Sequence, residues 1–247
     1  MKTIIALSRK GGTTKTTTCY AIGAGLRKQG KRVLFVDLDG QANLTISTGA
    51  NENELNTYDI LCNGANILDA IQQTDQGDII AGNELLHVGE RSLSGADDAF
   101  RLKKALEAVK SQYDYCIIDT PPALGMLTIN AIVAADKIIV PVQADLYSLQ
   151  GIPRIINTLE NVKDLCGVKR KIDGLLLTMF DPRPRVTRQI VEDMANIAKH
   201  YGTRIYNSRI RKCTALVEAE LQQQNIFDYA PRSNAAKDYM DLVNEIV

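Results

Sequence analysis

Short apolar runs alternate along this chain with longer segments in which apolar residues recur every three or four positions. Continuous apolar runs are typical of strands buried on both faces, and the longer pattern is typical of amphipathic helices. The alternation predicts an α/β fold, with a mostly parallel twisted sheet flanked by helices on both faces. We expect strands at 2–7, 32–37, 78–81, 115–119, 137–142 and 172–179, and a further short strand at 204–206.

The amphipathic segments predict helices at 15–29, 96–111, 126–134, 151–165, 186–200, 215–223 and 235–245. The polar, Gly- and Asn-rich stretch 49–83 predicts short helices between strands. No internal repeat or low-complexity linker divides the 247 residues, a length that suits one α/β domain. We therefore expect a single domain, 1–247. Because Met1 directly precedes the first strand, we expect no N-terminal DNA-binding extension.

Composition narrows the classes of function. The 29 basic and 29 acidic residues cancel, so nucleic-acid binding would need a local patch rather than a field over the whole chain. Trp is absent and Phe is scarce, which argues against an aromatic platform for stacking bases. The five cysteines form no C-x-x-C pair, which favours buried thiols in a reducing compartment over a metal site. No apolar stretch reaches a membrane-spanning length, so we expect a cytoplasmic protein.

The most informative segment is 3–18, where an apolar strand runs into a Gly-rich turn that ends in Lys-Thr. Gly11 and Gly12 allow backbone N–H groups to approach phosphate oxygens, and the following helix points its positive end at the same anion. Lys15 can reach the β- and γ-phosphates, and the Thr16 hydroxyl suits a Mg²⁺ ligand. The predicted nucleotide loop comprises Lys10, Gly11, Gly12, Thr13, Thr14, Lys15, Thr16 and Thr17.

Two positions depart from the general Walker A pattern, G-x-x-x-x-G-K-[ST]. Thr14 stands where that pattern has its last glycine, and Lys10 adds a second lysine at the front of the loop. A β-branched residue resists positive φ, so we expect the last turn of this loop to differ from the usual one. Two lysines around one loop also exceed what a single triphosphate requires.

Two aspartate segments follow strands at the spacing that a nucleotide site needs. Asp37 and Asp39 lie two residues apart at a strand exit, so their side chains point to the same side, toward the phosphates. Asp119 ends a buried strand and precedes Thr-Pro-Pro. This is a Walker B-like carboxylate, suited to orienting a Mg²⁺-bound water. Parallel strands deliver all three carboxylates to one edge of the sheet.

These motifs resemble the ParA/MinD family of ATPases with a deviant Walker A box. The likeness to small ParA/Soj-type partition ATPases covers essentially the whole chain, including the closing segment 228–239. It implies a P-loop NTPase fold, ATP and Mg²⁺ as cofactors, and hydrolysis to ADP and phosphate. It also implies that Lys10 reaches the partner subunit's nucleotide, that Asp39 positions the attacking water, that Asp37 supports Mg²⁺ or the loop, and that Pro231 lies near the adenine.

The segment 163–212 carries twelve Lys and Arg against five acidic residues. Its Asp-Pro-Arg-Pro-Arg stretch at 181–185 presents arginines on a proline-stiffened loop, which suits salt-sensitive binding to DNA phosphates. The resemblance places the family's loop arginine at Arg183 and leaves Ala215 where chromosomal relatives have a second arginine. The predicted DNA-binding residues are Arg183, Arg185, Arg188, Arg211 and Lys212.

The family resemblance also implies a cycle. An ATP-dependent homodimer binds nonspecific double-stranded DNA, and a ParB-like or other adaptor stimulates its slow hydrolysis. The dimer thereby positions a plasmid, a chromosome or other cargo, and the protein is cytoplasmic and nucleoid-associated. The sequence leaves the cargo and the adaptor open.

Four other classes of protein share parts of this pattern. A MinD-like membrane ATPase should end in a basic amphipathic helix, whereas this chain ends in the acidic segment 240–247, so we expect no membrane partner. A nitrogenase-reductase-like carrier needs poised cluster cysteines, and Cys62 and Cys116 do not suit that role. A small-molecule kinase needs an acceptor pocket that no motif indicates. In a non-enzymatic alternative, nucleotide only locks a dimer and is not hydrolysed. Measuring phosphate release with and without DNA distinguishes it from an ATPase.

Overall fold

The strands form one sheet in which a single pair of neighbours is antiparallel. The computed structural model describes residues 1–9, 12 and 14–247, and these form an eight-stranded sheet in the order β3-β4-β2-β5-β1-β6-β7-β8. All neighbours pair in parallel except β3 and β4. The strands are β1 (Lys2–Ala6), β2 (Val33–Asp37), β3 (Ile71–Thr74), β4 (Gly77–Ile80), β5 (Tyr115–Asp119), β6 (Lys137–Gln143), β7 (Gly174–Phe180) and β8 (Arg204–Arg211). The predicted fold class is confirmed.

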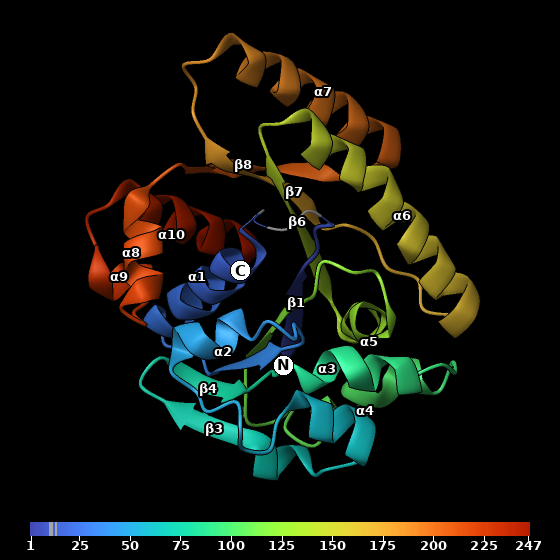
Figure 1. Cartoon of the computed structure of the whole chain (residues 1–247). Coiled ribbons are helices and arrows are strands. Elements are labelled where there is room, and N and C mark those ends of the chain that lie inside the picture. The colour runs from blue at the N-terminus through green and yellow to red at the C-terminus, as the bar shows by residue number, and fades with distance from the viewer. Residues whose placement is uncertain (10–11, 13) are drawn as a thin grey trace.

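Helices cover both faces of the sheet (Figure 1). They are α1 (Lys15–Lys28), α2 (Asn43–Thr48), α3 (Leu85–Gly89), α4 (Arg101–Glu107), α5 (Met126–Ala134), α6 (Leu146–Cys166), α7 (Arg185–Tyr201), α8 (Thr214–Leu221), α9 (Ile226–Tyr229) and α10 (Asn234–Ile246). Helices α3 to α7 pack one buried apolar cluster against the sheet, and α1, α2, α8, α9 and α10 pack a second on the opposite face. The near-continuous apolar strands are explained by this double coverage.

The strand register gathers the predicted chemistry at one edge. Strand β1 lies between β5 and β6, so the loop that follows it leaves the centre of the sheet. Asp37 at the end of β2 pairs directly with Asp119 at the end of β5. Carboxyl ends of parallel strands are the usual place for ligand sites in open α/β sheets. The phosphate loop and both aspartate segments therefore meet at the carboxyl edge.

Some boundaries differ from those that the sequence pattern predicts. Strand β3 was not predicted, because Ile71-Gln-Gln-Thr is largely polar and joins the sheet only as an antiparallel partner of β4. Helix α6 begins five residues earlier than expected, since Asp145 caps it by accepting a hydrogen bond from the Ser148 N–H at 2.8 Å. Strand β8 continues to Arg211, and its pairing with β7 shifts register between Leu175 and Leu177 and again between Leu177 and Phe180.

Side-chain hydrogen bonds hold a neighbouring segment beside each outer strand of the sheet. Beside β3, the Gln72 amide accepts from the Asn51 N–H and donates to the Asn51 carbonyl oxygen, each at 2.8 Å. Along β8, Glu245 of α10 accepts from the Ser208 N–H at 3.1 Å, and Asp238 of α10 accepts from another N–H of the same strand. The contacts along β8 occupy backbone N–H groups that an edge strand otherwise leaves unpaired, whereas the Gln72 side chain holds the Asn51 backbone beside β3.

Within the described part of the chain, no helix combines the length and apolar character needed to cross a bilayer.

Candidate nucleotide site

A cavity of about 510 Å³ opens at the carboxyl edge of the sheet. Lys15 lines this cavity and is 7% exposed, and its charge lowers the pKa of the buried Asp119. The lining residues are Gly12, Thr14, Lys15, Thr16, Thr17, Asp39, Gln41, Asn43, Ile46, Ser47, Pro122, Val217, Glu220 and Leu221. Lys10, Gly11 and Thr13 lie outside the described residues, so the predictions made for them stay predictions.

The backbone of Thr14 adopts the conformation that its side chain disfavours. Its φ is 65° and its ψ is 24°, in the left-handed region, and its carbonyl accepts the first helical hydrogen bond from the Thr18 N–H at 2.8 Å. Thr14 therefore takes the positive φ that a β-branched residue resists, and the structure does not support the expectation that it would avoid this conformation. The turn into α1 imposes the conformation, and the strain stays in Thr14.

Replacing Thr14 by glycine should stabilise the protein. A left-handed L-residue costs about 1–2 kcal/mol, which glycine avoids, so Thr14→Gly should raise the free energy of unfolding by about 1 kcal/mol. Urea denaturation followed by circular dichroism measures this difference. In the interior of α1, Ala24→Gly should instead lower it by about 1 kcal/mol. If Thr14→Gly lowers the free energy of unfolding as Ala24→Gly does, the strain interpretation is wrong.

Thr16 and Asp119 come together as a pair of oxygen ligands. The Thr16 hydroxyl donates to Asp119 Oδ2 at 2.5 Å, and Asp119 is fully buried. The neighbouring Thr120 hydroxyl donates to the Ala6 carbonyl oxygen at 2.7 Å, which fixes the end of β5 against β1. Mg²⁺ prefers one or two protein oxygens completed by phosphate oxygens and water. The pair therefore fits a magnesium ion held beside a phosphate group.

Asp37 and Asp39 have different surroundings although they lie two residues apart. Asp37 Oδ1 accepts from the Asp39 N–H at 3.0 Å, and Oδ2 accepts from the N–H and the hydroxyl of Thr45 at 2.9 and 2.8 Å. Asp39 accepts from the Gln41 N–H at 3.1 Å and lines the cavity. Of the two roles predicted for Asp37, these contacts favour support of the loop. A role as a metal ligand stays a prediction.

The two paired aspartates are costly to ionise. Burial raises the pKa of Asp37, and the nearby charge of Asp39 adds to the rise. Burial also raises the pKa of Asp119, and the charge of Asp37 adds to it, whereas the Thr16 hydrogen bond and the Lys15 charge lower it. A site that keeps such carboxylates ionised needs nearby positive charge. Lys15 supplies part of it, and a bound divalent cation would supply more.

Helix α8 contributes residues that the sequence pattern did not indicate. Glu220 accepts a hydrogen bond from the Thr17 hydroxyl at 2.6 Å, which connects α8 to the first turn of α1. Val217 and Leu221 flank the cavity and are largely exposed. No local signal marks these positions, because the approach of α8 to α1 is set by the packing of the chain after β8.

Comparison with known proteins agrees with this geometry. Residues 1–173 match a family model described as an AAA domain. Sporulation initiation inhibitor protein Soj of Bacillus subtilis is 39% identical over 250 residues, covering 99% of this chain and 98% of Soj. Chromosome partitioning protein ParA of Caulobacter vibrioides is 31% identical over 254 residues, covering 100% of this chain and 94% of ParA. The chain belongs to the ParA/Soj-type partition ATPase family.

A solved structure with the same fold shows which ligands such a site holds. Cobyrinic acid a,c-diamide synthase of Mycobacterium smegmatis superimposes on this ParA/Soj-family chain with a TM-score of 0.84 at 29% identity, over 100% of this chain and 94% of that one. That structure contains ADP and magnesium. The ligands match the oxygen pair and the glycine-containing loop described above.

Pro231 is not brought to the cavity. The family resemblance places it near the adenine, but here it is exposed between α9 and α10 and is not among the residues that line the cavity. Its adenine contact therefore stays a prediction for this ParA/Soj-family protein. The side chains of α8 lie closer to the phosphate loop, as the contact between Glu220 and Thr17 shows.

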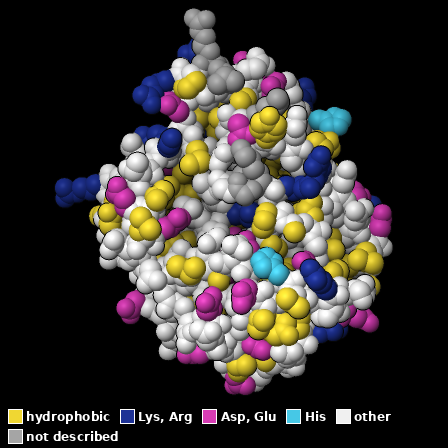
Figure 2. Space-filling view, viewed as in Figure 1, with side chains coloured by type: hydrophobic (Ala, Val, Ile, Leu, Met, Phe, Trp, Pro, Cys, Tyr) yellow, Lys and Arg dark blue, Asp and Glu magenta, His cyan; other side chains and the backbone are white. Residues whose placement is uncertain are grey.

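The basic residues of 163–212 do not form one surface. A hollow at the amino ends of β7 and β8 is lined by Lys169, Lys171 and Arg204. The phosphate loop lies at the other end of the strands, at the carboxyl edge. Arg183 and Arg188 follow β7 at the carboxyl edge. Figure 2 shows dark-blue Lys and Arg side chains over the upper part of this face, where β8 and α7 lie in Figure 1. The sequence pattern had joined two groups that the fold separates.

At the carboxyl edge, the predicted DNA-binding residues differ in their exposure and in their ion pairs. The Arg183 side chain is 87% exposed and forms a 2.7 Å ion pair with Asp181. Arg211 forms a 2.6 Å ion pair with Asp238, which competes for its guanidinium group. Arg188 and Lys212 are exposed, and Arg185 begins α7. Arg183 and Arg211 are thus both paired, but Arg183 is the more exposed of the two, and DNA contact by these residues stays a prediction.

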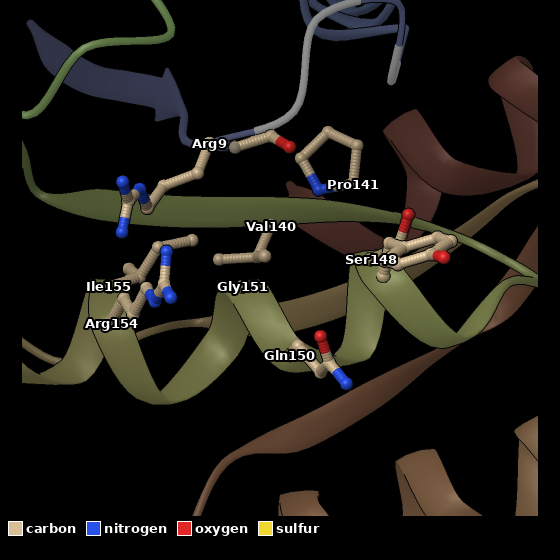
Figure 3. Close-up of a pocket in the computed structure, with 10 residues that line it drawn as sticks. Arg9, Val140, Pro141, Ser148, Gln150, Gly151, Arg154 and Ile155 are labelled. Carbon is tan, nitrogen blue, oxygen red and sulfur yellow. The ribbon is translucent and has the colours of Figure 1, made fainter.

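A second cavity, of about 280 Å³, lies beside the front of the phosphate loop. Figure 3 shows Arg9, from the segment after β1, and Arg154, from α6, with their guanidinium groups at the same end of this cavity. No carboxylate is among its lining residues, and neither arginine forms an ion pair with a residue that the structure describes. This end of the loop is therefore a locally positive surface.

Proposed function

We propose that this protein is an ATP-hydrolysing positioning ATPase that uses ATP and Mg²⁺ and switches its DNA binding with its nucleotide state. The observation that carries the proposal is the cluster at the carboxyl edge, where Lys15, the Thr16–Asp119 pair and Asp39 surround one cavity. A lysine, a hydroxyl–carboxylate pair and a water-directing carboxylate are the parts that phosphoryl transfer requires. The similarity to Soj and to the chromosome partitioning protein ParA supports the positioning role.

The chemistry follows from the placement of each group. Lys15 and the backbone N–H groups of the loop bind the β- and γ-phosphates, and Thr16, oriented by Asp119, faces the same oxygens. Mg²⁺, when bound, neutralises charge on the β- and γ-phosphate oxygens. Asp39 orients the water that attacks the γ-phosphorus and accepts its hydrogen bond, and ADP leaves with the bridging oxygen. Asp37 holds Asp39 in place through the Asp39 N–H.

Lys10 would couple ATP hydrolysis to dimerisation. A cation supplied by a facing subunit would stabilise the transition state in the manner of an arginine finger, worth roughly 10³-fold or more in rate. Hydrolysis would then be slow in the monomer and coupled to a nucleotide-bridged homodimer. An adaptor of the ParB-like kind would accelerate it further and release the dimer from DNA.

The DNA surface in this proposal is the basic rim at the carboxyl edge. Arg183, Arg188 and Lys212 lie on the same side of the sheet as the nucleotide loop, so a dimer closed by ATP would present two such rims together. Binding through phosphates alone is insensitive to sequence and weakens steeply with salt. The protein would therefore be cytoplasmic and associated with the nucleoid, where it would position a plasmid, a chromosome or another cargo.

The deciding experiment measures DNA binding and mass in each nucleotide state. Fluorescence polarisation with a duplex of arbitrary sequence should show binding with a non-hydrolysable ATP analogue and about tenfold or more weaker binding with ADP, steeply salt-dependent. Light scattering should show a dimer only with the analogue, and Lys10→Ala should remain monomeric. The double variant R183A/R188A should weaken DNA binding while leaving the dimer intact.

Three results would each contradict part of this proposal. If the analogue-loaded protein binds anionic vesicles but no DNA, the membrane-associated alternative replaces the DNA-based one. If phosphate release cannot be detected with or without DNA, nucleotide acts only as a structural lock. If Lys10→Ala dimerises and hydrolyses ATP like the unmodified protein, its action in trans is wrong.

A further inference from the structure

Gln143, the last residue of β6, lies between the phosphate loop and the end of β7. Its Nε2 donates to the Gly12 carbonyl oxygen at 2.6 Å and also lies 3.1 Å from Met179 Sδ. The carbonyl acceptor fixes the orientation of the amide, because only the NH₂ group can donate to it. One side chain thus contacts a loop of the nucleotide site and the strand that leads to the arginine segment.

The end of β7 is strained at this contact. Met179 has a φ of 50°, a left-handed conformation that is costly for a non-glycine residue. Thr178, which pairs with Gln143 in the sheet, carries a fully buried hydroxyl, the one buried side-chain oxygen or nitrogen without a hydrogen-bond partner among the described residues. A buried unpaired hydroxyl costs about 1–3 kcal/mol. Because both features destabilise this strand end, a rearrangement that relieves them would cost little free energy.

The residues after Met179 lead directly to the basic rim. The Phe180 carbonyl accepts from the Lys212 N–H at 3.3 Å, and the Arg209 guanidinium lies 5.2 Å from the centre of the Phe180 ring. Asp181 then pairs with Arg183. A small displacement of Met179 would therefore move the segment 180–183 relative to Lys212 and Arg209, two exposed cations of this edge.

We propose that Gln143 is the positioning residue that couples the nucleotide loop to the arginine segment 179–183. A nucleotide that binds the backbone of the phosphate loop shifts the Gly12 carbonyl oxygen. Gln143 follows this shift through its hydrogen bond and displaces Met179, which its amide also contacts. The rearranged strand end then presents Arg183 for phosphate contacts. This inference rests on the proposed nucleotide-dependent function and names the residue through which its two sites communicate.

The test compares two glutamine-to-glutamate variants. Gln143→Glu keeps the length of the side chain but removes the N–H donor to Gly12, whereas Gln150→Glu adds the same charge at an exposed position of α6. Hydrogen–deuterium exchange is measured on segment 179–183 with and without the ATP analogue at saturation. The unmodified protein and Gln150→Glu should show a nucleotide-dependent change in exchange, and Gln143→Glu should show none.

DNA affinity provides a second measurement. The ratio of dissociation constants in ADP and in the ATP analogue should fall about tenfold in Gln143→Glu, within the usual range of allosteric coupling. Met179→Gly, which tolerates positive φ and removes the sulfur contact, should lower the ratio in the same direction. If Gln143→Glu retains both the exchange response and the ratio, the coupling role is wrong. If no protein binds DNA but the exchange response depends on Gln143, the DNA proposal fails while the coupling stands.

Discussion

Lys15→Ala should weaken ATP binding by about 100-fold or more. Lys15 is buried at the base of the cavity, and truncating one member of a buried charged contact typically costs about 2–5 kcal/mol, where each 1.4 kcal/mol is tenfold. The loss should appear both in the dissociation constant for a fluorescent ATP analogue and in the rate of phosphate release. Isothermal titration calorimetry with unlabelled ATP provides the independent value.

Lys28→Ala is the matched control for this variant. Lys28 lies in the last turn of the same helix, α1, but is exposed and remote from the cavity. Its ATP affinity should stay within about twofold of the unmodified protein, because an exposed charge at that distance is screened by salt. Equal losses in both lysine variants would show that α1, rather than the Lys15 ammonium group, was disturbed.

Asp39→Asn should separate hydrolysis from binding. Asparagine keeps the oxygen that accepts from the Gln41 N–H but loses the negative charge that directs a water molecule. Acid–base assistance of this kind contributes about 10²–10⁴-fold, so the turnover number should fall by roughly that factor. The affinity for ATP should remain within about threefold, and the ATP-bound dimer should persist in light scattering.

Asp69→Asn serves as its control, since it removes an exposed carboxylate far from the cavity in the chain segment before β3. Its turnover should match that of the unmodified protein. Unchanged hydrolysis in Asp39→Asn would exclude this aspartate as the group that positions water. The search would then turn to Asp119, which lies beside Thr16.

Much of the architecture was predictable from the sequence because local pattern and burial agree. Strand β5 (Tyr115–Asp119) and helix α5 (Met126–Ala134) have the boundaries that the apolar pattern predicts. The gathering of Asp37, Asp119 and Lys15 followed from one rule, that parallel strands end at a common edge. Here the sequence spacing and the three-dimensional contacts carry the same information.

The remaining features depend on contacts between distant segments. Glu220 meets Thr17 across 203 positions, and Gln143 meets Gly12 across 131, so no local periodicity could indicate either pair. Thr14 illustrates a different failure, because its residue preference and its conformation conflict and the helix start prevails. Local conflicts of this kind are expected at functional sites, where the surrounding fold holds a strained residue in place.

The basic segment shows why charge along a sequence is a weak guide to a surface. Residues before and after β7 are close in sequence but lie at opposite ends of the sheet, because a seven-residue strand separates them. Counting Lys and Arg over 163–212 therefore overstates the charge available at the nucleotide edge. Only after the strands are placed can Lys171 and Arg183 be assigned to different surfaces.

The covered outer strands bear on how this molecule avoids unwanted self-association. The carboxylates of α10 occupy N–H groups along β8, and the Gln72 side chain holds the Asn51 backbone beside β3. An outer strand with unpaired backbone groups would otherwise risk pairing edge to edge with other copies and extending into fibrils. With its N–H groups occupied, β8 offers fewer positions for another copy to pair with, which leaves the proposed dimer to the carboxyl edge of the sheet.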